Sequence, residues 1–415
     1  MLFEVSALWQ HLAALSDARR PRGKRYPLPL VLLLVVLAKL GGEDRPSGIA
    51  DWVAHRRQAL QTALGIHWPR MPHHNTYRRV LAEAVDPNAL DAAVGAVLRA
   101  QPGVGRSVLV SIDGKTVRGT ITDEAPRGQH LLAAYLPAEG VVLMQVAAGE
   151  KEHEITVAPQ LLDALDLRGN VVVGDAMHTQ RALSAQIVAA GGDYLWIAKE
   201  NQPTLRADIA DLFAIDARTV AGGRVAQDRR TVTMVDTGHG RQERRTLTAS
   251  RDLKGYSEWP GLDQVFRLER HRRITATGKE THEVQYGLTS LSPARAGARG
   301  ILVLSRVCWG IENGLHRCRD VTFHEDATKL TQGQAGRVMA ALNNLVIGLL
   351  RLAGETNLAA ARRQHNADLG RSMALLTEAD RPEAGSGTAH GTDRKTNSPW
   401  PPSTGTAMEA GPSAP

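Results

Sequence analysis

The chain has 415 residues, enough for two or three domains that each bury a core of their own. Hydrophobic residues make up 43% and charged residues 22%, as in an ordinary globular protein. Two cysteines are too few for a disulfide framework, which excludes a disulfide-stapled scaffold and favours a reducing compartment. The net charge of +7 suits a polyanionic partner such as DNA but does not identify one.

Residues 1 to about 100 are predicted to be helical, because apolar runs alternate there with proline, glycine and charged breaks. The most apolar run, over 28–40, is too short to span a bilayer and predicts a buried helix. The first residues lack the basic-then-apolar order of a signal peptide, so we expect a soluble intracellular protein. Basic stretches over 19–25 and 73–79 fit DNA phosphates and solvated loops equally well.

From about residue 105 the pattern changes to strands that alternate with helices. SVLVSIDG, HLLAAYL, VVLMQVAAG, VVVGDA and DYLWIAKE predict strands, and LLDALDL and QRALSAQIVAA predict helices. This order indicates a mixed α/β layer rather than a sandwich. Alternating segments between about 215 and 300 predict antiparallel strands, which we interpret as a β-rich insertion. Helices resume near 300, and the Pro-, Gly- and Ser-rich segment 380–415 predicts a disordered tail.

Two acids follow two of the apolar strands. Asp113 comes at the end of SVLVSID and Asp175 at the end of VVVGD. A carboxylate in that position is costly without a partner, and strand ends in α/β sheets are where ligand sites gather. Two such carboxylates brought together would repel unless divalent cations lie between them, as in two-metal phosphoryl transfer. The alternative for each Asp is a simple cap on the following turn or helix.

A third acid lies on a predicted helix in SRVCWGIENGLHRCRDVTFHEDA. Glu312, His316 and Arg319 are four and seven residues apart and would share one helix face. A metal-binding acid with a basic residue two turns along could hold both a metal ion and a phosphate. An ordinary pattern of helix salt bridges would also place these residue types there.

The strings IDGKTVRG, GDAMHTQRAL, GGDYLWIAKENQPTL and WGIENGLH, followed by RDVTFHEDA, resemble the DDE transposases of the ISAs-type, H-repeat-associated insertion-sequence family. The segment LSDARRPRGKRYPLPLVLLLVVLAKLGG resembles the N-terminal domain associated with that family. The resemblance implies an RNase H-like catalytic fold over 105–375, interrupted by a β-rich insertion, after a helical domain over 1–100. It also implies that Asp113, Asp175 and Glu312 are the catalytic metal ligands for two Mg²⁺ or Mn²⁺ ions.

The same resemblance implies metal-dependent nicking at the ends of a mobile element and strand transfer into target DNA. The partners would be the terminal inverted repeats, target DNA and further copies of the chain on the DNA, in the bacterial cytoplasm at the nucleoid. Two alternatives stay open: a non-transposing nuclease on the same scaffold, and an inactive copy that binds DNA as a repressor. The residues expected to contact DNA are Lys115, Arg118, Lys199, Asn201, Gln202, His316 and Arg319.

The chain departs from the family pattern in places. Cys308 and Arg317 stand where a histidine and an aromatic residue are expected, and GEKEHEI replaces a lysine-serine-asparagine form. These departures leave every expected metal ligand in place. Cys308, His316, Cys318 and His324 could suggest zinc, but they lack a paired Cys-x-x-Cys, so we predict reduced thiols instead.

Overall fold

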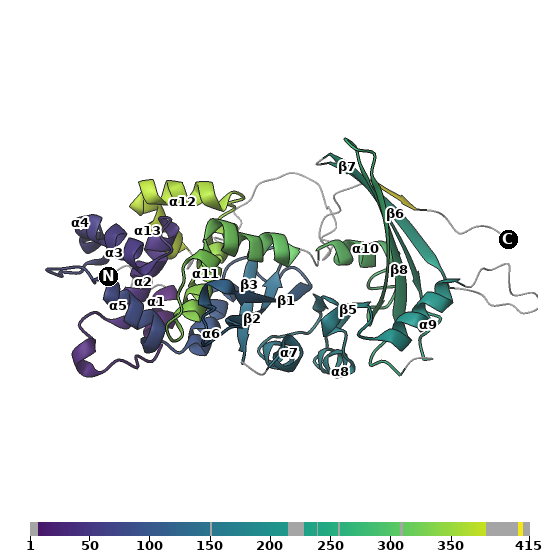
Figure 1. Ribbon diagram of the computed structural model, residues 1–415, viewed down its shortest axis with the longest axis horizontal. Coiled ribbons are helices and arrows are strands. Elements are labelled where there is room, and N and C mark those ends of the chain that lie inside the picture. The colour runs from purple at the N-terminus through teal and green to yellow at the C-terminus, as the bar shows by residue number, and fades with distance from the viewer. Residues whose placement is uncertain are drawn as a thin grey trace, which may run out of the picture. The chain divides into compact units, whose positions relative to one another are not determined.

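The computed structural model describes residues 7–149, 152–214, 228–238, 240–255, 258–307 and 310–378, together with the strand 406–409. These residues form a mixed α/β protein with a large mixed sheet, which confirms the predicted fold class at that level (Figure 1). The chain divides into two compact units. The first contains Met1–Arg106, Asp113–Leu165 and Gly310–Asn397, and the second contains Ser107–Ile112, Asp166–Trp309 and Ser398–Pro415.

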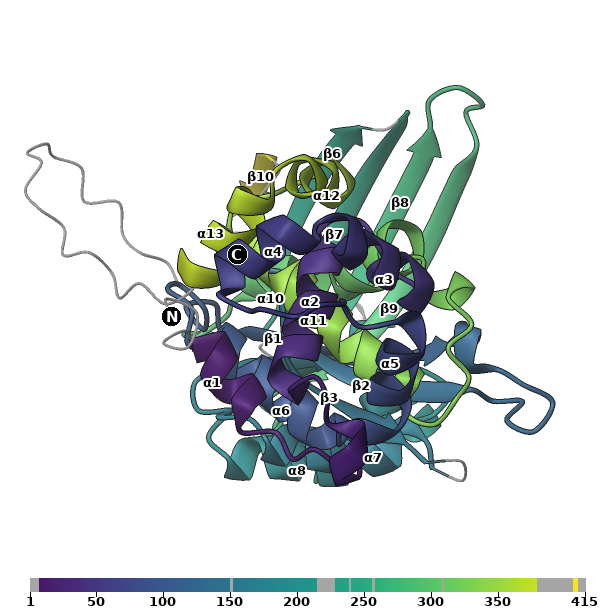
Figure 2. The same cartoon turned by 90° about the vertical axis from the view of Figure 1, so that its left-hand side faces the viewer.

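Helices dominate the first unit. Prolines begin α3 and α6, where the missing N–H costs nothing, and the Asp86 carboxylate caps α6 by accepting from the Asn88 N–H at 3.0 Å. Helix α2 is apolar except for Lys39, which pairs with Asp44, and the helix is buried. It packs with α1, α3 and α11 (Figure 2). The helices of this unit are α1 Ala7–Ala13, α2 Leu28–Leu40, α3 Pro46–His55, α4 Arg57–Leu64, α5 His74–Arg79, α6 Pro87–Arg99, α7 Glu154–Asp163, α11 Ala335–Leu352, α12 Leu358–Ala367 and α13 Leu369–Glu378.

Helix α11 is long and apolar enough to cross a membrane, and it is the one such helix among the described residues. Of its most apolar 18-residue window, 89% is buried inside the structure. A core helix passes the same test of length and composition, so this helix is weak evidence for a membrane span.

Strand β1 (Leu109–Val117) runs through both units, with Leu109–Ile112 in the second and Asp113–Val117 in the first. In the first unit it lies beside β2 (Gln129–Leu136), which pairs antiparallel with β3 (Val141–Ala148). Side chains of a strand alternate between faces, and Val117 packs with Leu131 and Ala340 of α11. Asp113 and Lys115 therefore share the face of β1 that meets α11, whereas Gly114 lies against Glu154 of α7.

The second unit is built on strands that continue from β1 in the order β1-β4-β5-β9-β8-β7-β6. Strands β1, β4 and β5 are parallel, and β9 pairs antiparallel with β5. A core of aliphatic residues and Phe266 lies between the strands and α10, and α8 and α9 pack on β5, β8 and β9. The elements are β4 Val171–Gly174, β5 Asp193–Ala198, β6 Arg230–Gly238, β7 Arg241–Ser250, β8 Gln264–Ile274, β9 Glu280–Thr289, α8 Arg181–Ala189, α9 Pro203–Ala214 and α10 Ala298–Val307.

Strands β6 to β9 form a continuous antiparallel ladder within the segment where alternation predicts antiparallel strands (Figure 1). Residues 215–227 of that segment lie outside the described residues. The same holds for the predicted tail 380–415, except for Thr406–Glu409, which form β10 antiparallel to β6.

Candidate active site

Asp113 lies inside strand β1, not at its end as the sequence predicts, because the strand continues to Val117 through GKTV. One carboxylate oxygen, Oδ1, accepts from the Gly114 N–H at 3.0 Å. The other, Oδ2, lies 3.3 Å from Nε2 of His316. The Asp113 side chain is 29% exposed, so its carboxylate is open to solvent while its backbone is fixed in the sheet.

Glu312 and His316 are brought to Asp113 by an unusual helix. Residues Glu312–His316 form a π-helical turn, and Cys318–Thr322 form a second one. Such widened turns occur rarely and are frequent at functional sites. Ligand atoms of Asp113, Glu312 and His316 all lie within 4.8 Å of one another. Asp113 and Glu312, the first and third of the predicted acids, thus lie together with a histidine within the first unit.

These three residues fit a divalent cation. His316 is buried, and neither ring nitrogen has a hydrogen-bond partner among the described residues, although Nε2 is within ion-pair distance of Asp113. A buried polar atom without a partner is costly, and a metal ion is one way to satisfy it. Two converging carboxylates also repel each other unless a cation lies between them. Oxygen ligands suit Mg²⁺ and Mn²⁺, and an imidazole nitrogen suits softer divalent ions.

The segment that follows Glu312 is anchored by buried charges. Arg319 is fully buried and donates from Nε to both carboxylate oxygens of Glu325 at 2.9 Å. Its Nη1 donates to the Gln145 side chain on β3 at 3.0 Å. Lys115 on β1 reaches Asp320 at 2.5 Å, and Arg362 on α12 donates to the Thr322 carbonyl. The π-helical segment is therefore tied to the β-sheet and to α12.

This arrangement changes the interpretation of three residues expected to contact DNA. Arg319 has no exposed surface and is paired with Glu325. Lys115 is largely buried against Asp320, and His316 is buried beside Asp113. Helical spacing placed Glu312, His316 and Arg319 on one face, but the π-helical turns direct Arg319 into the core. Arg319 and Lys115 thus pair with acids of their own unit, and His316 lies in the cluster that could hold a metal ion.

Asp175 follows β4 in the second unit and is more exposed than Asp113. Its Oδ1 accepts from the Met177 N–H at 3.0 Å, and Nε2 of the buried His178 lies 3.8 Å away. Gly174 permits this packing, since a Cβ there would lie 2.9 Å from the His178 ring and 3.0 Å from Ile112. Both predicted acids thus accept a nearby backbone N–H and have a buried histidine beside them. A histidine three residues after a strand-end acid is the signal that sequence reasoning overlooked.

Two polar residues expected to line a DNA path instead brace the Asp175 loop. The Asn201 side chain donates to the Ala176 carbonyl at 2.6 Å, and the Gln202 side chain donates to the Thr179 carbonyl at 2.9 Å. Lys199, two residues before Asn201, is exposed, and so is Arg118 in the first unit.

Strand register fixes the start of the Asp175 loop. Within the second unit, β1 pairs in parallel with β4 from Leu109 opposite Val171 to Ile112 opposite Gly174. The residue after Gly174 is Asp175, so the loop that carries it begins where this pairing ends.

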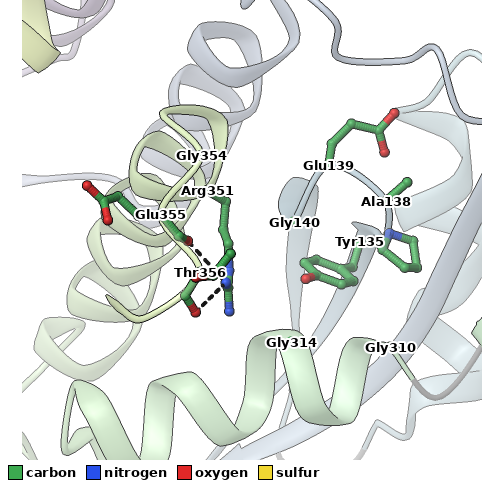
Figure 3. A pocket seen from close by; sticks show the side chains of 11 residues that line it. Tyr135, Ala138, Glu139, Gly140, Gly310, Gly314, Arg351, Gly354, Glu355 and Thr356 are labelled. Atoms are coloured by element: carbon green, nitrogen blue, oxygen red, sulfur yellow. Dashed lines mark hydrogen bonds between the residues drawn. The ribbon is translucent and has the colours of Figure 1, made fainter. Parts of the chain in front are cut away.

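A polar cavity of about 360 Å³ adjoins the helix that carries Glu312 (Figure 3). Tyr135, the β2–β3 turn and Arg351 line it, and Arg351 donates to the Glu355 and Thr356 carbonyls at 3.1 and 3.0 Å. Burial raises the pKa of Tyr135 to about 12. A Cβ at Gly314 would lie 2.4 Å from the Tyr135 hydroxyl, so glycine is needed for this close approach.

The zinc alternative gains no support from the described residues. Cys308 lies outside them, and Cys318 is free, with its Sγ 3.7 Å from Arg351. His316 groups with Asp113 and Glu312 rather than with Cys318 or His324.

A mixed α/β sheet with a cluster of carboxylates and a buried histidine that could hold a metal ion is consistent with a metal-dependent enzyme. The model of the transposase DDE domain matches residues 105–349, and the model of the domain associated with it matches residues 9–97. The chain therefore belongs to the DDE transposase family.

Curated relatives agree with this assignment. Protein YhhI of Escherichia coli (strain K12), whose name places it among the H repeat-associated transposases, is 27% identical over 84% of this chain and 91% of its own length. Protein YbfL of the same strain shows the same identity and coverage. A protein from the dhlA 3′ region of Xanthobacter autotrophicus is 31% identical over 63% of this chain and 87% of its own length. The predicted resemblance to this insertion-sequence family is confirmed.

Proposed function

We propose that this transposase nicks DNA at the ends of an insertion sequence and transfers the freed 3′-hydroxyl into target DNA. Asp113, Asp175 and Glu312 are its catalytic carboxylates. The observation that carries the proposal is the convergence of Asp113, Glu312 and His316 donor atoms within 4.8 Å, in a chain of the DDE transposase family. The match to the transposase DDE domain over residues 105–349, which contains all three acids, supports Asp175 as the further carboxylate.

Two Mg²⁺ or Mn²⁺ ions are the proposed cofactors. When bound, such ions stabilise the charge on the attacking and leaving oxygens and make water or a 3′-hydroxyl nucleophilic. Asp113, Asp175 and Glu312 would hold them through carboxylate oxygens.

The chain's own residues prepare this site. His316 orients Asp113 through the carboxylate oxygen that the Gly114 N–H leaves open. His178 lies beside Oδ1 of Asp175, the oxygen that the Met177 N–H already bonds. Hydrogen-bond partners of a metal-binding carboxylate orient that carboxylate and increase its affinity for the metal. Asn201 and Gln202 fix the loop after Asp175 from β5. The buried pair of Arg319 and Glu325 holds the Glu312 segment rigid.

DNA contacts are proposed for the exposed cations. Arg118 and Lys199 are solvent-accessible and follow strands of the catalytic sheet, so they can meet phosphates near the acids. Basic residues over 19–25 and 73–79 extend this proposal to the N-terminal region.

For the domain organisation, we propose a helical domain over 1–100 and an RNase H-like catalytic domain over 105–375, with an insertion at about 215–300 and a tail from 380. Terminal inverted repeats and target DNA are the proposed partners. On them the chain would act as a homo-oligomer in the cytoplasm, at the nucleoid.

The test is cleavage of a supercoiled plasmid that carries the element's own ends, with Mg²⁺. The native chain and a Glu124→Ala control, which removes an exposed carboxylate of the same unit, are expected to cut at the ends. Glu312→Ala is expected to bind the ends without cutting. Binding without cutting by all three proteins, with Mg²⁺ and with Mn²⁺, would contradict the proposal and favour a DNA-binding repressor.

A further inference from the structure

We propose that the β8–β9 hairpin of the second unit carries a separate transition-metal site, formed by Glu269, His271 and His282, that binds Zn²⁺ or a similar ion. Ligand atoms of these three side chains lie within 4.8 Å of one another. The site is independent of the proposed catalytic function, since none of the three residues belongs to the acidic cluster around Asp113.

Strand register builds this cluster. Glu269 and His271 are two residues apart on β8, so they project from the same face. His282 on β9 is directly opposite His271, and the two imidazole rings stack with centroids 4.1 Å apart. Two ligands at i and i+2 on one strand, with a third opposite on its neighbour, form a compact triangle of donors on one side of a sheet.

The donor chemistry favours a borderline ion over Mg²⁺. Two imidazoles and one carboxylate are a common zinc set, and a water molecule completes four-coordination. Zn–N bonds of about 2.0–2.1 Å put tetrahedral donors roughly 3.4 Å apart, so donor atoms within 4.8 Å of one another need to close by at most about 1.4 Å. His271 and His282 are exposed and can make this movement.

Nearby cations do not block the site. Arg267 forms an ion pair with Glu269 at 2.8 Å, but it also donates to the Phe213 carbonyl and lies 5.9 Å from the Phe213 ring centroid. It therefore keeps partners if Glu269 turns to a metal ion. Arg244 on β7 is opposite His271, and its exposed side chain can extend into solvent.

The position of the cluster indicates what the ion would do. The half of β8 near β5 is buried, whereas Arg272 to Ile274 and the first residues of β9 are largely exposed. At this end the strands stay paired in the β6–β9 ladder, but their exposed side chains bury little surface. A metal ion that bridges β8 and β9 would cross-link this end of the hairpin, as structural zinc sites do in small domains.

Zinc titration calorimetry tests the proposal. The parent protein carries Asp113→Ala and the buffer holds excess Mg²⁺, so that zinc binding at the acidic site does not contribute to the signal. The parent is expected to bind one Zn²⁺ at the hairpin. His271→Ala and His282→Ala should lose that equivalent or bind at least about tenfold more weakly. His55→Ala, which removes an exposed histidine of α3, should bind like the parent.

Hydrogen exchange gives the second measurement. Zinc should slow the exchange of amides over 272–282 in the parent and leave His282→Ala unchanged. Binding of equal zinc by the parent and both histidine variants, or no hairpin-dependent binding by the parent, would overturn the proposal.

Discussion

The Asp113 cluster and the Glu269 cluster both combine carboxylate and imidazole donors within 4.8 Å, but they are built differently. In the first, His316 is buried and its helix is tied down by buried ion pairs. In the second, both histidines are exposed and only the register of two strands brings them together. A site whose geometry must be fixed before substrate arrives needs the buried framework. An exposed cluster gains its order from the ion it binds.

The first prediction concerns the buried pair beneath the Glu312 segment. Glu325→Ala leaves the fully buried Arg319 guanidinium without its carboxylate, so we expect a loss of about 3–5 kcal/mol in the free energy of unfolding. The exposed pair of Arg168 and Asp166 is the control, and Asp166→Ala should change the free energy of unfolding far less, because solvent screens that pair. Denaturant titration measures both. Equal losses of unfolding free energy in Glu325→Ala and Asp166→Ala would contradict the proposal that the buried ion pair stabilises the Glu312 segment more than an exposed pair could.

The second prediction concerns pH. Asp91 contacts Arg337 and Gln145, and burial raises its pKa to about 7 despite Arg337. Because this folded-state pKa lies above that of the unfolded chain, the group's contribution to stability is fully present below about pH 4 and is lost as pH rises through 7. The Asp91→Asn side chain cannot ionise. As pH rises from about 4 to above 7, the free energy of unfolding of this variant should therefore increase relative to that of the native chain by up to roughly 4 kcal/mol. Parallel pH profiles of the two unfolding free energies would contradict this.

The third prediction concerns the close approach between the Glu312 helix and β2. Gly314→Ala places a methyl group against the Tyr135 hydroxyl, and such overpacking costs about 1–3 kcal/mol. The DNA cleavage rate should fall with it, because Glu312 is two residues away. Tyr135→Phe removes the hydroxyl, and the double variant should recover much of both losses. Failure of this rescue would show that the contact does not position the helix.

The smallest effect is expected at the exposed cluster without metal. His282→Ala removes a side chain that packs on little besides His271, so in a chelator its unfolding free energy should stay within about 0.5 kcal/mol of the native value. With zinc, the difference in unfolding free energy between the native chain and His282→Ala should grow, because only the native chain binds the ion at the hairpin. A loss above 2 kcal/mol in chelator would mean that the histidines stabilise the hairpin by packing alone.

Local pattern predicted much of the framework. Runs such as SVLVSID and VVVGD are apolar and rich in β-branched residues, and they form β1 and β4. Asp175 follows its strand as expected, whereas β1 continues past Asp113 to Val117. The alternating runs between 230 and 289 form β6 to β9. These elements can be predicted because side-chain periodicity is a local property, visible in the sequence of each strand or helix alone.

What the sequence could not predict depends on register and on helix type. A π-helical turn has no clear sequence signature, so α-helical spacing predicts Arg319 on the face of Glu312 and in contact with DNA, whereas the structure buries it. The partner of Asp113 is His316, some 200 residues away in sequence, and only packing brings them together. Similarly, His271 and His282 meet because of the length of a hairpin turn. The roles of Asp113, Asp175 and Glu312 as metal ligands remain predictions.

Strand transfer from a pre-cut element end tests the central claim most directly. A duplex with a free 3′-hydroxyl at the element end is mixed with a target plasmid and Mg²⁺. Native protein is compared with Asp113→Asn, Asp175→Asn and Glu312→Gln. The native chain is expected to join the end to the plasmid, and each variant should bind the duplex without joining it. Joining by any of the three variants would contradict the assigned carboxylates, and hydrolysis without joining by the native chain would indicate a nuclease.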